Sequence, residues 1–256
     1  MSAVDLILKE TLQELQSLYS LSNFPLAGGT NLSLRYNHRK SIDIDLICNK
    51  IIGKKGLQVI IDEITDYFGE DKVIINLINE ELDEQFSFIR CFINKKGLTI
   101  KVEILQNLQF LFPPEIFEGF KVISKIDVGL LKLMSASNRF VKKDIYDLDY
   151  ITDDIDLVDL FNHFKIKQET FNKPEHRNLF DLDGEISPIE DLSLLLEFDN
   201  QNIKSKNKPF HSDDRIDIVE GGKSWQNARL NWRSKMRKLY ATEAKEFPGP
   251  KGINIS

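Results

Sequence analysis

The 256-residue sequence predicts an α/β (α+β) protein in which a first part mixes helices with strands and a last part is mainly helical. Three patterns predict this fold class. Leucines recur at helical spacing before residue 20, segments 41–47 and 98–105 alternate between apolar and polar residues, and helical apolar stripes dominate after residue 125. We expect two domains, residues 1–151 and a mainly helical C-terminal region, residues 152–256.

The helices are predicted from apolar residues that recur every three to four positions. A glycine at position 69 would end the second of them well. A polar stretch at 199–214 indicates a long loop. The expected helices cover residues 4–19, 55–68, 125–139, 139–151, a segment that opens on the acids at 153–156, 188–198 and 224–240.

The strands are predicted from alternation and from the turn residues between them. They cover residues 41–47, 73–77, 85–93 and 98–105, and a hairpin turn at 94–97 joins the last two. In the last strand Lys101 and Glu103 share the face opposite the buried aliphatic residues. Glu103 is therefore a candidate third carboxylate beside the aspartates described next.

Asp43 and Asp45 lie on one face of the predicted strand 41–47, about 7 Å apart at Cα. Two carboxylates so placed repel each other, and aspartate is disfavoured in strands. A divalent cation would remove the conflict, and ligands that are all oxygen favour magnesium. The alternative interpretation is a solvent-exposed strand face that is acidic.

A glycine-rich turn precedes this strand. Gly28 and Gly29 follow a short apolar run, and glycines allow the backbone to approach a ligand closely. Thr30 or Asn31 is expected to cap a short helix through Tyr36, whose N-terminal amides would face a phosphate.

Two basic features each have two interpretations. Lys132 lies inside an apolar helical segment, where it either snorkels to solvent or binds a ligand phosphate. Arg229, Arg233 and Arg237 form a row at i, i+4 spacing on the last helix. That row is either a solvated face with acidic partners or a contact to nucleic-acid phosphates.

Composition is that of a globular protein, with 41% hydrophobic and 29% charged residues. The net charge of −6 means that any nucleic-acid contact must come from a local basic patch. Cys48 and Cys91 lack metal-type spacing and are expected to be buried thiols. No segment resembles a signal peptide or a membrane span, so we expect a cytoplasmic protein without a membrane partner.

Four segments resemble one known family. They are GGTNLSLR with HRKSIDIDL, then KVEIL, then GLLKL, then KDIYDL, within residues 24–151. In this order they resemble the nucleotidyltransferase toxins of the AbiEii/AbiGii type, which belong to the DNA polymerase β-like nucleotidyltransferase superfamily. Glu103 stands where aspartate is common in the family.

The resemblance implies a mixed sheet flanked by helices, with a nucleotidyltransferase core in residues 1–151. The implied reaction is Mg²⁺-dependent transfer of an NMP from an NTP. Two Mg²⁺ ions would be held by Asp43, Asp45 and Glu103, and these three residues with Lys132 would be catalytic. The implied nucleotide-binding residues are Gly28, Gly29, Thr30, Asn31, Arg39, Lys132, Asp144 and Asp147.

The resemblance also implies partners. The most plausible acceptor is RNA, in particular tRNA, and the chain would be the toxin of a toxin–antitoxin or phage-defence pair with a cognate antitoxin. An RNA acceptor predicts that Arg35, Arg39 and Lys40 lie with the arginine row on the active-site side. The alternatives are transfer to a protein or small molecule, or a catalytically silent interaction module.

Overall fold

The computed structural model describes residues 2–199 and 215–249, so the loop predicted at 199–214 lies outside the described residues except at its first position. The chain forms two compact units. The first comprises Met1–Val128, Ile166–Glu185 and Asp217–Gly222, and the second comprises Gly129–Lys165, Ile186–Ile216 and Lys223–Ser256. The domain division expected at residue 151 stays a prediction.

The first unit contains a four-stranded mixed sheet with strand order β1-β4-β3-β2. Strand β1 pairs with β4 in parallel, and the other neighbours are antiparallel. The expectation of a mixed sheet is therefore confirmed. The strands are β1 (Asp43–Ile47), β2 (Val73–Ile78), β3 (Phe88–Lys95) and β4 (Leu98–Leu105).

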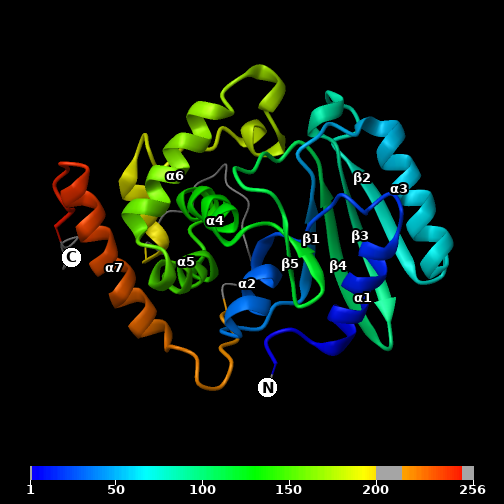
Figure 1. The fold of residues 1–256 in the computed structure, drawn as a ribbon, viewed down its shortest axis with the longest axis horizontal. Coiled ribbons are helices and arrows are strands. Elements are labelled where there is room, and N and C mark those ends of the chain that lie inside the picture. The colour runs from blue at the N-terminus through cyan, green and yellow to red at the C-terminus, as the bar shows by residue number, and fades with distance from the viewer. Residues whose placement is uncertain (1, 200–214, 250–256) are drawn as a thin grey trace, which may run out of the picture. The chain divides into compact units, whose positions relative to one another are not determined.

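Helices α1 (Leu6–Ser17) and α3 (Gly53–Phe68) pack on one face of this sheet (Figure 1). Their apolar stripes and the inward residues of the strands form one buried cluster. Because side chains alternate along a strand, the polar residues of β1 and β4 occupy the opposite face. The predicted helices 4–19 and 55–68 are confirmed, with Gly69 after the second.

Helix α2 (Gly28–Tyr36) ends where the sequence predicts, but its predicted start is wrong. The helix begins at Gly28 after Ala27, which makes no side-chain cap bond, so Thr30 and Asn31 lie inside the first turn and not at the cap. A small hairpin of β5 (Glu115–Phe117) and β6 (Phe120–Val122), which the sequence did not predict, completes this unit's strands among the described residues.

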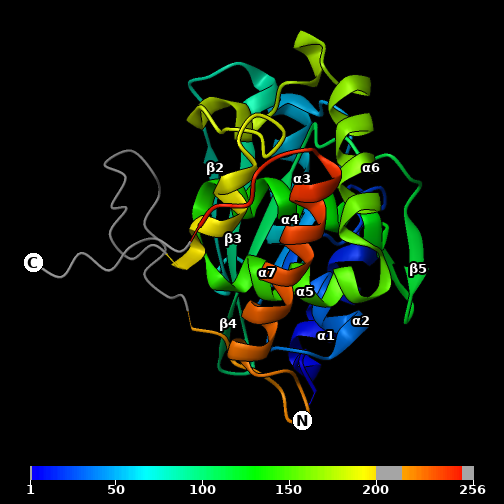
Figure 2. The ribbon, with the colours of Figure 1, turned by 90° about the vertical axis from the view of Figure 1, so that its left-hand side faces the viewer.

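Helical segments build the second unit. Helices α4 (Lys125–Arg139) and α6 (Leu157–Thr170) each have part of their length in it, and α5 (Lys142–Asp154) and α7 (Trp225–Thr242) lie wholly within it. Figure 2 shows α7 alongside α5. Within the described residues, every helix is too short or too polar to cross a lipid bilayer.

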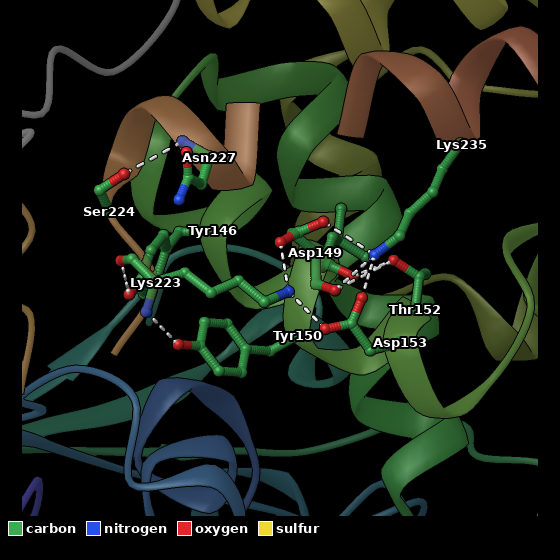
Figure 3. Close-up of polar contacts among 10 residues, drawn as sticks. Tyr146, Asp149, Tyr150, Thr152, Asp153, Lys223, Ser224, Asn227 and Lys235 are labelled. Atoms are coloured by element: carbon green, nitrogen blue, oxygen red, sulfur yellow. Dashed lines mark hydrogen bonds and ion pairs between the residues drawn. The ribbon is translucent and has the colours of Figure 1, made fainter. Parts of the chain in front are cut away.

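Charged side chains join α5 to α7 (Figure 3). The buried Asp149 accepts from Lys223 at 2.6 Å and from Lys235 at 2.8 Å. Asp153, one helical turn further along α5, pairs with the same two lysines. This cluster of Asp149, Asp153, Lys223 and Lys235, the α5–α7 lock, holds Asp153 in the last turn of α5, so residue 153 does not begin α6 as predicted.

Two other predicted boundaries are wrong. The strand expected at 85–93 begins three residues later, because a 3₁₀ turn, η1 (Glu84–Phe86), precedes it. The helix expected at 188–198 is a 3₁₀ segment, η4 (Leu192–Asp199), held through the indole N–H of Trp232, which donates to the Leu195 carbonyl at 2.9 Å. Two more 3₁₀ turns occur in the described part of the chain, η2 (Pro174–His176) and η3 (Leu179–Asp183).

Candidate active site

Asp43 and Asp45 project from one face of β1, since the intervening Ile44 is fully buried on the other. The parallel pairing with β4 sets Asp43 beside Lys101 and Asp45 beside Glu103. The three predicted carboxylates therefore lie on neighbouring strands of the same sheet face, as the alternation predicts.

Gly28 lies directly against the Asp45 carboxylate. A Cβ atom at Gly28 would stand 1.9 Å from Asp45 Oδ2, closer than any real contact, and the residue has φ +64. The Ala27 N–H donates to the Asp45 carbonyl at 2.7 Å, which holds the start of α2 against β1. Glycine is therefore required here twice, for its backbone conformation and for the space that the carboxylate occupies.

Thr30 and Asn31 belong to the framework of the turn. The Thr30 hydroxyl bonds to Ser41 Oγ at 2.8 Å and donates to the Asp43 carbonyl. The Asn31 amide donates to the Leu26 carbonyl at 3.0 Å and to a carbonyl of the segment before α4. Both side chains are buried: Thr30 bonds α2 to β1, and Asn31 bonds it to the segments before α2 and before α4. A nucleotide contact by either residue stays a prediction.

Glu103 is held by two cations. Arg90 Nε donates to Glu103 Oε1 at 2.8 Å, and Lys101 Nζ lies 3.3 Å from Glu103 Oε2 and 3.7 Å from Asp43 Oδ2. Burial by itself would raise the pKa of Glu103, but Lys101 and Arg90 together hold that pKa below its ordinary value. Glu103 is thus an anion with both oxygens engaged.

Two of the three carboxylates have the chemistry and the placement to hold a divalent cation. Among residues 2–199 and 215–249, no three His, Cys, Asp or Glu side chains are grouped so that they could hold a metal ion. Asp43 and Asp45 offer hard oxygen donors on one face, the chemistry that Mg²⁺ prefers. Both oxygens of Glu103 accept from cations, Arg90 and Lys101, and a metal contact by Glu103 stays a prediction.

Lys132, on α4, is buried with two aspartates of α5. Its Nζ lies 2.8 Å from Asp144 Oδ1 and 2.8 Å from Asp147 Oδ2, and Arg139 contacts Asp144 at 3.0 Å. The interpretation of a lysine that snorkels to solvent is therefore wrong. Burial would raise the pKa of Asp144, but Arg139 and Lys132 together lower it. Asp144 and Asp147 orient Lys132 in this structure.

The first predicted basic cluster is mostly internal. Arg35 donates to Glu115 at 2.5 Å and to Asn31 at 2.7 Å, and Arg39 is buried with a bond to the Lys40 carbonyl at 3.1 Å. Only Lys40 of this cluster is exposed. The guanidinium of Arg39 lies near Gly29, where a Cβ atom would stand 2.5 Å from its Nη2.

The arginine row of α7 is more open. Arg233 and Arg237 stack on the Phe247 ring, at 5.7 and 4.9 Å from its centroid. Arg237 is exposed, whereas Arg229 and Arg233 are half-buried. Stacked guanidiniums keep their charge and part of their donor edge free of the ring plane.

Sequence reasoning did not identify the ion partners of Glu103 or of Asp144. Lys101 stands two residues before Glu103 on the same strand face, a signal that alternation alone provides. Arg90 could be found only from the antiparallel register, which sets it opposite Glu103. Arg139 lies five residues before Asp144, across the break between α4 and α5, so helical spacing does not indicate the pair.

Comparison with known proteins places these residues in a family. The family model for the nucleotidyl transferase AbiEii toxin of type IV toxin–antitoxin systems matches residues 13–245. No curated protein matches the chain.

Among solved structures, JHP933 from Helicobacter pylori is 17% identical with a TM-score of 0.47, and the match covers 92% of this chain and 93% of that one. MenT4, a nucleotidyltransferase toxin from Mycobacterium tuberculosis H37Rv, is 15% identical with a TM-score of 0.49, covering 91% and 84%. The match across residues 13–245 shows that this chain belongs to the AbiEii nucleotidyltransferase toxin family, and is a nucleotidyltransferase.

Proposed function

We propose that this chain transfers an NMP from an NTP to RNA, with tRNA as acceptor, in a Mg²⁺-dependent reaction, as the toxin of a toxin–antitoxin or phage-defence pair. The observation that carries the transfer chemistry is the close approach of Gly28 to the Asp45 carboxylate. It sets a helix N-terminus, which favours phosphate, beside the pair Asp43 and Asp45, which favours a metal ion. The two halves of a metal–triphosphate complex would then meet at one place.

In this proposal Asp43 and Asp45 hold Mg²⁺, and the backbone amides of Gly28, Gly29 and Thr30 face the triphosphate. The acceptor hydroxyl attacks the α-phosphorus, the new O–P bond forms, and the bond to the β-phosphate breaks to release pyrophosphate. The bound ion would supply charge stabilisation for the attacking and leaving oxygens.

Glu103 is a poor candidate for a general base that would deprotonate the acceptor hydroxyl. A base works best when its pKa lies near the operating pH. Lys101 and Arg90 hold the pKa of Glu103 below its ordinary value, against the effect of burial. We therefore assign Glu103 an electrostatic role and leave deprotonation of the hydroxyl to solvent.

Lys132 is proposed to bind the triphosphate, with Asp144 and Asp147 as its positioning residues. Both aspartates lie 2.8 Å from its ammonium, so its orientation is set before any nucleotide arrives. Such preorganisation lowers the cost of aligning a cation with developing negative charge. Contacts of Asn31, Arg39, Asp144 or Asp147 with base or ribose remain part of the proposal.

The RNA acceptor is supported by the family resemblance and by the arginine row Arg229, Arg233 and Arg237 on α7. The cluster of Arg35, Arg39 and Lys40 supports it less, because two of its three members are bonded internally. An RNA acceptor would place the reaction in the cytoplasm, and membership of a type IV family implies a cognate antitoxin.

The acceptor can be identified by labelling. The chain is incubated with each α-³²P-labelled NTP, Mg²⁺, total RNA and total protein, and the labelled fraction is identified. We expect label in small RNA with one NTP and none when EDTA replaces Mg²⁺. Label in protein or in a small molecule would establish the alternative acceptor, and no label in any fraction would indicate a silent module.

Asp43→Asn provides the matched control for this assay. The amide keeps the shape of the side chain but removes one charge from the metal pair, so we expect transfer to fall below detection. Because Asp43 is exposed at the strand edge of the site and repels Asp45, the apo fold should be as stable as the wild type or slightly more stable. Wild-type turnover by Asp43→Asn would refute the metal assignment.

A further inference from the structure

The charged sheet face around Asp43 holds cations where a second metal ion would be expected. Across β1, β4 and β3 the register aligns Asp45, Glu103 and Arg90 in one row, with Asp43 and Lys101 beside it. The ammonium of Lys101 bridges the row, at 3.3 Å from Glu103 and 3.7 Å from Asp43.

These pairs differ from ordinary surface ion pairs. The side chain of Glu103 is only 17% exposed, and both of its oxygens accept from a cation. The Lys101 ammonium lies 3.7 Å from Asp43 Oδ2 and 3.3 Å from Glu103 Oε2, so two carboxylates favour a positive charge at the place where Lys101 stands.

The charges match those of a metal ion. The single charges of Lys101 and Arg90 together equal that of one divalent cation. A Mg²⁺ ion that bound Glu103 would have to displace two hydrogen-bonded cations and would stand beside their like charges. A Mg²⁺ ion on Asp43 and Asp45 would leave the contacts of Arg90 with Glu103 in place.

We propose that Lys101 and Arg90 take the place of the second divalent cation, so that the transfer site binds a single Mg²⁺ through Asp43 and Asp45. The inference rests on the proposed function and departs from the two ions that the family resemblance implies. Glu103 then anchors Lys101, and the ammonium of Lys101 supplies positive charge near the attacking hydroxyl.

The test counts bound metal and does not depend on turnover. Mn²⁺ is titrated into the full chain with the α,β-methylene analogue of ATP, GTP, CTP or UTP, one at a time, and bound Mn²⁺ is measured by EPR and equilibrium dialysis. With the analogue that binds, we expect one Mn²⁺ per wild-type chain. The double variant Lys101→Met with Arg90→Met frees the Glu103 carboxylate, so it should bind two, with the spectral broadening of a close Mn²⁺ pair.

Two further variants make the count decisive. Glu103→Gln should still bind one Mn²⁺ with wild-type affinity, and this variant keeps an acceptor for Arg90 if the double variant folds poorly. Lys95 lies in the same hairpin and pairs with Glu14 of α1, away from the carboxylates, so Lys95→Met should also bind one. Two Mn²⁺ in the wild type, loss of an ion in Glu103→Gln, or one ion in a folded double variant would overturn the inference. Absence of Mn²⁺ with every analogue would instead refute the proposed function.

Discussion

At the scale of single residues, the glycine turn at Gly28 is the feature that tolerates substitution least. Gly28→Ala would place a methyl group on the Asp45 carboxylate in a backbone conformation that disfavours side chains. We expect it to abolish metal-dependent NTP binding and to lower the free energy of unfolding by more than the φ penalty of about 1–2 kcal/mol. Binding can be measured by thermal shift and stability by urea unfolding.

Gly97→Ala is the matched control for that variant. Gly97 also has positive φ, +82, but a Cβ atom there would meet nothing within 4 Å. It should therefore show the φ penalty alone and keep NTP binding. Equal stability losses in the two variants, with NTP binding retained in Gly28→Ala, would mean that the approach to Asp45 has no role.

Lys132 gives the second prediction at this scale. Lys132→Met would leave Asp144 and Asp147 buried without their shared cation, so we expect a loss of about 3–5 kcal/mol in unfolding free energy. Adding Asp144→Asn and Asp147→Asn removes the stranded charges and should recover part of that loss. Urea unfolding of the wild type, Lys132→Met, the double aspartate variant and the triple variant measures the coupling between Lys132 and the two aspartates. Independent, additive losses would contradict the buried network.

At the scale of elements, α5 carries two ionic clusters within the second unit. One of its faces presents Asp144 and Asp147 to Lys132, and Asp149 forms the α5–α7 lock with Lys223 and Lys235. Two tyrosine hydroxyls of α5 add to the lock: Tyr146 donates to the Lys223 carbonyl at 2.7 Å and Tyr150 accepts from the Lys223 N–H at 2.7 Å.

Asp149→Ala tests how much the α5–α7 lock contributes. Removal of this buried carboxylate leaves Lys223 and Lys235 with only Asp153, so the expected loss is about 3 kcal/mol or more. Lys238, also on α7, pairs with Asp156 and is 64% exposed, so Lys238→Ala should cost about 0–1 kcal/mol. Equal costs in urea unfolding would show that the lock is only a surface pair.

At the scale of the whole molecule, the ion clusters set the dependence of stability on pH. Burial opposes ionisation of Asp144 and Asp153, but Arg139 with Lys132 in one case, and Lys223 with Lys235 in the other, lower both pKa values. Their contribution is present above the ordinary aspartate pKa of about 4 and is lost as pH falls through the lowered values.

At alkaline pH, the dependence of stability on pH includes a contribution from Lys223. Burial would lower its pKa, but bonds to Asp149 and Asp153 raise it. Its contribution is complete below the ordinary lysine pKa of about 10.4 and is lost as pH rises through the raised value. We therefore expect the contributions of Asp144, Asp153 and Lys223 to be constant between about pH 5 and 9, measured as unfolding free energy against pH in the wild type and in variants of these residues. Asp144→Asn should flatten the acid limb alone, and an unchanged acid limb in that variant would exclude Asp144 as its source.

The sequence by itself determined the local features of this protein. The alternation of 41–47 predicts the shared face of Asp43 and Asp45, the spacing of leucines predicts α1, and the ordered segments from Gly28 to Asp147 indicate the family. Such features are readable because the repeats of a strand and a helix follow from covalent geometry, which neighbouring residues alone decide. Ends set by distant contacts are less readable, as the misplaced start of β3 and the 3₁₀ form of η4 show.

Only the tertiary structure decided which charges meet. Arg90 faces Glu103 because β3 and β4 pair in one particular register, and Lys132 meets Asp147 because α4 packs against α5. A shift of one residue in a strand register would send Arg90 to the opposite face of the sheet. These ion partners depend on packing between segments distant in sequence, so no pattern within a segment could show that Arg90 pairs with Glu103 or that Lys132 pairs with Asp147.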